Sequence, residues 1–169
     1  MPIDVLETTA TTASDRPYKP RGVADRLFQC DAPEVLLEGP AGTGKSRAAL
    51  EKVLLYCMHW DGCRVLLMRQ TRESMSESVL VTFEKKVVPE GHPILGGASR
   101  RFRQVYDFPN GSTIVVGGLD KPDKIMSTDY DLVVVFEATE ISQDAWEKLT
   151  TRLRNVVLPF QQAIADCNR

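Results

Sequence analysis

The chain has 169 residues, which is typical of one domain and too short for two full catalytic domains. A formal net charge of −2, with 43% hydrophobic and 26% charged residues, argues against a surface coated with basic residues for binding polyanions. No apolar run approaches the roughly 20 residues that span a bilayer, and the N-terminus lacks the pattern of a secretory signal. We therefore expect a cytoplasmic protein with no membrane partner.

Residues 1–16 are predicted to form a polar leader, and residues 17–169 a single domain. The four cysteines form no Cys-x-x-Cys pair and have no histidine-rich segment beside them, so they indicate neither a zinc site nor a disulfide framework. We interpret them as buried thiols. His59 and His92 are isolated, and we interpret them as helix-end or loop residues rather than ligands.

Hydrophobic periodicity in the first half of the chain predicts an alternation of helices and strands. The expected elements are a short helix over 23–28, a strand over 34–39, a helix over 44–59, a strand over 64–69 and a helix from about 73 that ends before Pro89.

The second half begins with two strand-like runs around Pro109-Asn110-Gly111, a sequence that favours a hairpin turn. The most apolar strand, over 132–136, should lie in the middle of the sheet. A helix over 142–155 with Ser142 as its N-cap and a last strand over 161–166 follow. The alternation of strands with helices implies a mainly parallel α/β sheet flanked by helices.

A phosphate-binding loop is predicted where the first strand meets the next helix. Its residues, which fit the pattern Gly-x-x-x-x-Gly-Lys-Ser/Thr, are Gly39, Pro40, Ala41, Gly42, Thr43, Gly44, Lys45 and Ser46. Gly42 and Gly44 can adopt positive φ, so that backbone N–H groups converge on phosphate oxygens at the positive end of the helix. We expect Lys45 to reach the β- and γ-phosphates and the Ser46 hydroxyl to coordinate Mg²⁺. The predicted ligand is therefore ATP, with Mg²⁺ as its metal.

Hydrolysis also needs carboxylates at the end of a neighbouring strand. The strand over 132–136 runs directly into Glu137, and Glu140 follows three residues later. Ligands of open α/β sheets lie at this edge. Two assignments are open. In the first, Glu137 is the water-polarising base and Phe136 stands in place of a metal-binding acid. In the second, Glu137 binds the metal and Glu140 is the base. In a third interpretation both are solvated loop acids.

Six segments occur in the order found in the large terminase subunit, the DNA-packaging ATPase of tailed bacteriophages, which the chain resembles. They are LLEGPAGTGKSRAALEK, RVLLMRQTRESMSESVLVTFE, FPNGSTIVVGGLD, DLVVVFEATEIS, WEKLTTRLRN and ADCN. The resemblance covers nearly all of the chain from Pro17 onward. It implies a P-loop NTPase domain of the RecA-like (ASCE) type, truncated at its C-terminus. The family's nuclease domain is then absent, and we expect no DNA cleavage by this chain alone.

The same resemblance implies a motor that hydrolyses ATP to drive double-stranded DNA into a procapsid in the host cell cytoplasm. Its expected partners are the DNA, further copies of itself in a homo-oligomeric ring on the portal, and a small terminase subunit. A nucleic-acid helicase or translocase is the alternative, because GPAGTGKS also resembles helicase phosphate loops. A further alternative is a nucleotide-binding switch with little turnover.

Roles for single residues also follow from the resemblance. The family's Glu motif matches EATE, which makes Glu137 the catalytic glutamate beside Lys45, with a contribution to Mg²⁺ through water. Phe136 then stands where many members carry the metal-binding acid. The segment 166–168 resembles the family's coupling element, which senses the γ-phosphate. Local candidates for adenine contact are Tyr18, Arg21 and Gln29.

Ring motors of this kind complete one subunit's site with an arginine from the next. The candidates are Arg69, Arg72, Arg100, Arg101, Arg103, Arg152 and Arg154. The cluster SRRFRQ, residues 99–104, has two open interpretations, a contact to DNA phosphates or a solvated loop.

Overall fold

The computed structural model describes residues 17–168, so the leader expected over residues 1–16 lies outside the described part. The strands are β1 (Glu34–Gly39), β2 (Arg64–Arg69), β3 (Val105–Asp107), β4 (Thr113–Gly118), β5 (Leu132–Val135) and β6 (Gln162–Asn168). The helices are α1 (Val23–Gln29), α2 (Lys45–His59), α3 (Arg72–Ser74), α4 (Leu80–Thr82), α5 (Pro122–Met126) and α6 (Gln143–Thr150). Shorter turns are the π-helical η1 (Met75–Val79) and η2 (Phe83–Val87) and the 3₁₀ turns η3 (Pro93–Leu95) and η4 (Ala138–Glu140).

The strands form one six-stranded sheet in the order β1-β6-β5-β2-β4-β3. Neighbouring strands are parallel throughout, except for the antiparallel pair of β3 and β4 around the predicted hairpin turn. The prediction of a mainly parallel α/β sheet is confirmed, and so is the central place of the apolar strand β5. The carboxyl ends of β1, β5 and β6 consequently meet at one edge of the sheet.

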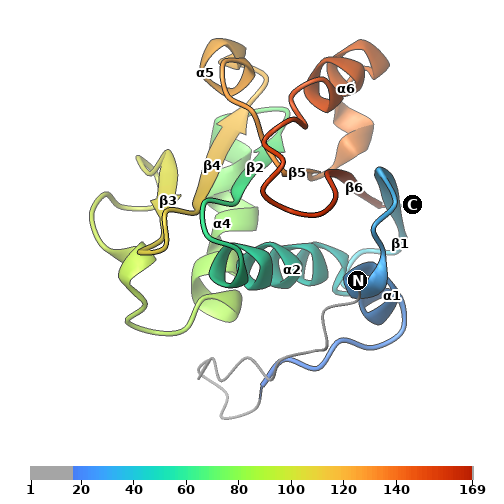
Figure 1. Ribbon diagram of the computed structural model, residues 1–169. Helices are drawn as coiled ribbons and strands as arrows, with labels where there is room; N and C mark the ends of the chain where they lie inside the picture. Colours follow the sequence, from blue (N-terminus) through green and yellow to red (C-terminus); the bar gives the residue numbers. More distant parts are fainter. Residues whose placement is uncertain (1–16, 169) are drawn as a thin grey trace.

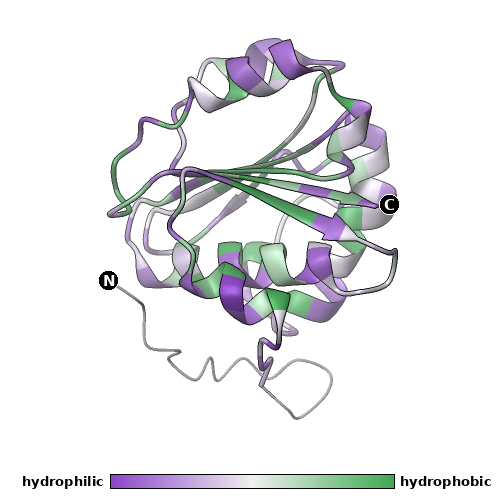
Figure 2. Ribbon diagram, turned by 90° about the vertical axis from the view of Figure 1, so that its right-hand side faces the viewer, coloured by the Kyte–Doolittle hydropathy of each residue, from purple (hydrophilic) through white to green (hydrophobic). Residues whose placement is uncertain are grey.

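Helices cover both faces of this sheet (Figures 1 and 2). Alternate residues of β5 point to opposite faces, as the two-residue period of a strand requires. Leu132 and Val134 pack in the larger apolar cluster, with α1, α2 and the helical segment 72–87. Val133 and Val135 pack in the smaller cluster, with α5 and α6. The central strand is therefore buried on both sides, which holds its carboxyl end firmly in place.

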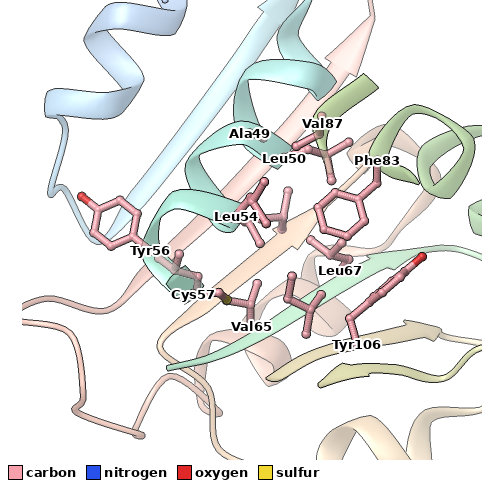
Figure 3. Packing of buried hydrophobic residues seen from close by; sticks show 14 of the residues in the cluster. Ala49, Leu50, Leu54, Tyr56, Cys57, Val65, Leu67, Phe83, Val87 and Tyr106 are labelled. Atoms are coloured by element: carbon pink, nitrogen blue, oxygen red, sulfur yellow. The ribbon is translucent and has the colours of Figure 1, made fainter. Parts of the chain in front are cut away.

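The larger cluster fixes α2, the helix that follows the phosphate loop. Leu50 and Leu54 of α2 lie against Leu67 of β2 and Phe83 of the next helix (Figure 3). All four side chains are at most 3% exposed. Burying a side chain of this size contributes about 1.5–3 kcal/mol, so the position of the loop's helix is set by the core.

Four elements differ from the sequence predictions. The helix expected from about 73 is formed by α3, η1, α4 and η2, so two of its turns are π-helical. Helix α6 ends at Thr150, which places Arg152 and Arg154 after the helix rather than in its last turn. Strand β6 continues to Asn168, so the segment 166–168 lies within a strand. Helix α5 was not predicted. Within residues 17–168, no helix is both long and apolar enough to cross a membrane.

A buried lysine ties the N-terminal helix to the site. The Lys52 ammonium donates hydrogen bonds to the carbonyl oxygens of Leu27 and Cys30 and to Oε1 of Gln162, at 2.7–2.9 Å. Lys52 is fully buried, and burial lowers its pKa to about 8. Because Lys52 belongs to α2 and these partners belong to α1, its C-cap and β6, the lysine holds α1 against α2, the helix that follows the phosphate loop, and against β6.

Candidate active site

The loop between β1 and α2 has the backbone that the sequence predicted. Gly42 and Gly44 have φ values of 77° and 81°, in the left-handed region that side-chain-bearing residues rarely adopt. Gly44 is the N-cap of α2, and its carbonyl accepts the first helical hydrogen bond from Ala48 at 2.9 Å. The free N–H groups and the positive end of a 15-residue helix therefore face the loop.

Lys45 lies inside the curve of this loop. Its ammonium donates to the carbonyl oxygens of Gly39 and Pro40, at 2.9 and 2.7 Å, and to the Thr43 hydroxyl at 3.2 Å. The Thr43 hydroxyl in turn donates to the Pro40 carbonyl at 2.9 Å. These bonds hold a positive charge beside the loop backbone. A positive charge in this position suits an anion such as a phosphate.

Glu137 lies two residues after the end of β5 and is connected to the loop through one side chain. Asn168, at the end of β6, donates from Nδ2 to Glu137 Oε1 at 2.6 Å. Its Oδ1 accepts a hydrogen bond from Lys45 at 3.2 Å. The structure therefore brings Glu137 and Lys45 to the same edge of the sheet with Asn168 between them.

The backbone at Glu137 is in the left-handed region, at φ 50° and ψ 54°. Such a conformation costs a residue with a side chain about 1–3 kcal/mol, and it persists where the surroundings impose it. Strain of this kind concentrates at functional sites.

Glu140 is engaged elsewhere. Its two carboxylate oxygens accept from Nε and Nη2 of Arg69, at 3.1 and 3.0 Å. This hydrogen bonding raises the pKa of the Arg69 guanidinium. Of the two acids that the sequence left open, the one connected to the phosphate loop is Glu137.

Phe136 belongs to the core. Its side chain is 2% exposed and lies in the larger apolar cluster, on the α2 side of the sheet. An aromatic ring offers no ligand to a cation such as Mg²⁺, which prefers oxygen.

Asp166, on β6, is the acid that touches the loop. The Ser46 hydroxyl donates to Asp166 Oδ2 in a close contact. Asp166 is 2% exposed. Burial raises the pKa of its carboxyl, and the Ser46 hydrogen bond and the charge of Lys45 oppose that rise. In the sequence, Asp166 is predicted only as part of a coupling element; the signal that could have marked it is a lone acid inside the strand sequence QAIADCN.

Comparison with known proteins identifies the family of this chain. The sequence profile of the phage terminase large subunit family matches residues 34–165. This chain belongs to that family. The matched range contains the phosphate loop, Glu137 and all six strands but the last residues of β6.

Solved structures show the same fold. The ATPase domain of the large terminase from Thermus phage P74-26 aligns with a TM-score of 0.67 at 20% identity, covering 90% of this chain and 66% of that one. The large terminase of another thermophilic bacteriophage, in complex with ADP, aligns with a TM-score of 0.60 at 12% identity, covering 80% and 33%. The UvsW helicase of bacteriophage T4 aligns with a TM-score of 0.56 at 13% identity, covering 91% and 55%. A search of curated proteins found no match.

This terminase chain covers 33% of that ADP-bound large terminase and 66% of the P74-26 ATPase domain. At identities of 20% and below, these likenesses establish the fold.

A cavity of about 440 Å³ opens beside the phosphate loop of this terminase domain. Tyr18 and Arg21 line it together with Gly44 and Arg47. The Tyr18 ring lies 5.1 Å from the Arg47 guanidinium. Two of the three predicted adenine contacts thus lie next to the loop. The third, Gln29, hydrogen-bonds at 3.4 Å to Asp25 on the exposed side of α1 and does not line the cavity.

A larger cavity of about 910 Å³ lies away from the terminase phosphate loop, between the start of the 72–87 helix and residues 99–101. Its lining mixes Arg72, Arg100 and Lys121 with Glu73 and Asp120, and it holds none of the predicted catalytic residues. We therefore place the candidate active site at the smaller cavity, where the loop lies.

The arginine candidates separate by burial. Arg103 is 6% exposed and donates to the carbonyl oxygens of Ile94, Leu95 and Gly96 at 2.8–3.0 Å, so of the open candidates its guanidinium is not available to DNA or to a neighbouring subunit. Most of the others contact groups of this chain: Arg69 with Glu140, Arg72 with the Arg103 carbonyl, Arg100 with Glu84, Arg152 with the Met126 carbonyl and Arg154 with Asp129. Arg101 is exposed beside the exposed ring of Phe102.

Proposed function

We propose that this terminase domain hydrolyses ATP as the motor for packaging double-stranded DNA into a procapsid. The observation that carries the proposal is the link from Lys45 through Asn168 to Glu137, because it joins a phosphate-binding loop to a carboxylate at the same sheet edge. A phosphate loop alone supports nucleotide binding, whereas hydrolysis also needs a group that positions the attacking water.

Each side chain has a role in this proposal. The loop backbone and Lys45 hold the β- and γ-phosphates, and Tyr18 and Arg21 border the cavity that would take the base and sugar. Ser46 would hold Mg²⁺, which would neutralise phosphate charge when bound. Glu137 orients and polarises the water, and Asn168 fixes the direction of its carboxylate.

Membership of the terminase family also supports the proposed partners. They are double-stranded DNA, further copies of this chain in a ring on the portal, and a small terminase subunit, all in the host cell cytoplasm. The exposed Arg101 is the remaining member of the 99–104 cluster that we propose as a contact to a DNA phosphate or to a neighbour's nucleotide. That the chain alone does not cut DNA stays a prediction.

The test is ATP turnover by the chain in the presence of Mg²⁺, with and without procapsids and linear double-stranded DNA. A packaging motor should be stimulated by procapsids. The fold similarity to the UvsW helicase supports one alternative, a nucleic-acid helicase or translocase. Unwinding of short duplexes with free ends would favour this alternative. If the chain binds ATP but does not hydrolyse it in a single-turnover assay, the result would favour a nucleotide-binding switch.

A further inference from the structure

We propose that Asp166, on strand β6, is the metal-binding carboxylate of the site. At the end of strand β5, where an acid could have this role, the chain has Phe136. The inference rests on the proposed function, since Mg²⁺ would come with the nucleotide. It concerns a residue of this chain that its family resemblance had placed in the coupling element.

Strand register places the two residues beside each other. Val135 of β5 pairs with Ala165 of β6, so one step further along the parallel strands sets Phe136 beside Asp166. On its other side Asp166 pairs with Leu37 of β1, the strand that leads into the phosphate loop. Asp166 is therefore one strand closer to the loop than position 136.

Strand alternation gives both residues the same direction. Ile164 and Phe136 pack in the cluster on the α2 side of the sheet. Asp166, two residues after Ile164, faces that side as well, in agreement with its contact to Ser46 on α2. A carboxylate at position 166 thus lies on the same face of the sheet as an acid at position 136 would.

The contact with Ser46 has the right chemistry for a cation site. The Ser46 hydroxyl donates a hydrogen bond to Asp166, which leaves the hydroxyl oxygen's lone pairs available. Mg²⁺ is commonly bound by one or two protein oxygens, substrate phosphates and several waters. One carboxylate and one serine hydroxyl next to a phosphate loop are such a set.

Charge supports the same assignment. Asp166 is almost fully buried, and burial of a carboxylate is costly unless a positive charge or hydrogen bonds compensate it. Lys45 interacts with it electrostatically, yet the Lys45 ammonium hydrogen-bonds to the loop carbonyls and Asn168. A divalent cation held by Asp166 would offset the remaining cost of desolvating the carboxylate.

The test measures nucleotide binding rather than turnover. Binding of the non-hydrolysable analogue AMP-PNP to the full chain is measured by calorimetry, once with Mg²⁺ and once with EDTA. We expect wild type to bind more tightly with Mg²⁺. In the nearly isosteric Asp166→Asn, affinity in EDTA should be close to wild type, and the Mg²⁺ needed to enhance binding should rise by about 10- to 100-fold. Asp129→Asn, which removes a carboxylate paired with Arg154, is the matched control and should keep the wild-type Mg²⁺ response.

A second variant separates metal binding from a structural role. In Asp166→Cys the thiolate prefers soft metals, so Cd²⁺ should enhance AMP-PNP binding where Mg²⁺ does not. A carboxylate that merely held Ser46 in place would give no such change of metal preference. This variant also decides the matter if Asp166→Asn fails to fold, as checked by circular dichroism.

Three results would overturn the inference. The first is a response to Mg²⁺ in folded Asp166→Asn that equals that of wild type. The second is an equal loss of AMP-PNP affinity by Asp166→Asn in Mg²⁺ and in EDTA. The third is binding of AMP-PNP by wild type without any response to Mg²⁺. All three leave nucleotide binding by wild type intact, so they contradict the assignment of Asp166 alone. Absence of AMP-PNP binding by wild type under both conditions would instead refute the proposed function, and the inference with it.

Discussion

At the scale of single residues, Asn168 joins the parts of the site that come from different strands. Its amide donates to Glu137 and accepts from Lys45, so one planar group fixes the distance between the acid and the phosphate loop. A side-chain amide is suited to this position because it is donor and acceptor at once. The left-handed backbone of Glu137 turns the acid toward that amide.

Replacing Lys45 by Ala should abolish detectable ATP binding. Charge-assisted hydrogen bonds contribute about 1.5–3 kcal/mol each, and Lys45 would make more than one to the phosphates. The measurement is calorimetry or binding of a fluorescent ATP analogue. Lys148→Ala, at an exposed lysine of α6, is the control and should bind like wild type. Unchanged affinity in Lys45→Ala would refute the phosphate-loop assignment.

Replacing Glu137 by Gln should leave ATP binding intact and lower turnover by about 10²–10⁴-fold, the range expected on losing a general base. Gln retains the shape and an acceptor for Asn168, so the loss reports on the carboxylate charge. Steady-state ATPase rates and nucleotide affinity, measured on the same preparation, provide the comparison. Glu140→Gln breaks the ion pair with Arg69 and should turn over ATP normally. The opposite pattern would make Glu140 the base.

At the scale of elements, a buried carboxylate organises the segment between α6 and β6. Asp131 is fully buried and accepts hydrogen bonds from the backbone N–H groups of Arg64, Val157 and Leu158 at 2.8–3.1 Å. The Asn155 amide adds another at 2.7 Å. These bonds hold the start of β5 to the segment that leads into β6, and so help set the register that brings Asp166 and Asn168 to the site.

Asp131→Ala should lower the free energy of unfolding by about 3–5 kcal/mol, because it leaves several buried donors without an acceptor. Urea denaturation followed by circular dichroism measures this change. At the neighbouring, partly exposed Asp129, the ion pair with Arg154 is worth about 0–1 kcal/mol, so Asp129→Ala should cost little. Equal losses in the two variants would show that Asp131 does not organise the segment.

At the scale of the whole molecule, two apolar clusters on opposite faces of one sheet hold the fold together, with helices covering both (Figure 2). The groups of the candidate active site lie at the edge where the core ends, so polar side chains there are partly buried. The Glu51 carboxyl of α2 is also partly buried: burial raises its pKa from 4.5 to about 7, and the neighbouring Arg47 opposes the rise.

The raised pKa of Glu51 predicts a pH dependence of stability. Its protonated form is favoured by folding, so its contribution is fully present below about pH 4.5 and is lost as pH rises through about 7. Glu51→Gln removes this loss and should stabilise the protein by about 1–3 kcal/mol at pH 8, with little effect at pH 4. Thermal or urea unfolding of both proteins across this range measures it. Destabilisation by Glu51→Gln at pH 8 would mean that the ion pair with Arg47 outweighs burial.

Local patterns predict most of the elements and the loop. The strands 34–39 and 64–69 and the helix that follows the loop are evident from periodicity, since one face or both faces of each is buried. The π-helical turns of the 72–87 helix are not evident from periodicity. The predicted end of α6 is too late, because Arg152 continues a helical pattern while its guanidinium donates to the Met126 carbonyl on another element.

The sequence by itself determined the phosphate loop, because a glycine-rich turn between a strand and a helix is specified by residues that are neighbours in the chain. It also determined the apolar strands whose burial makes the sheet. Only the tertiary structure decided which acids meet that loop, because Ser46 and Asp166 are 120 positions apart and are brought together by the pairing of β1 with β6. Sheet order is set by which strands pair across the whole core, and that order placed Asp166 and Asn168 between the loop and Glu137.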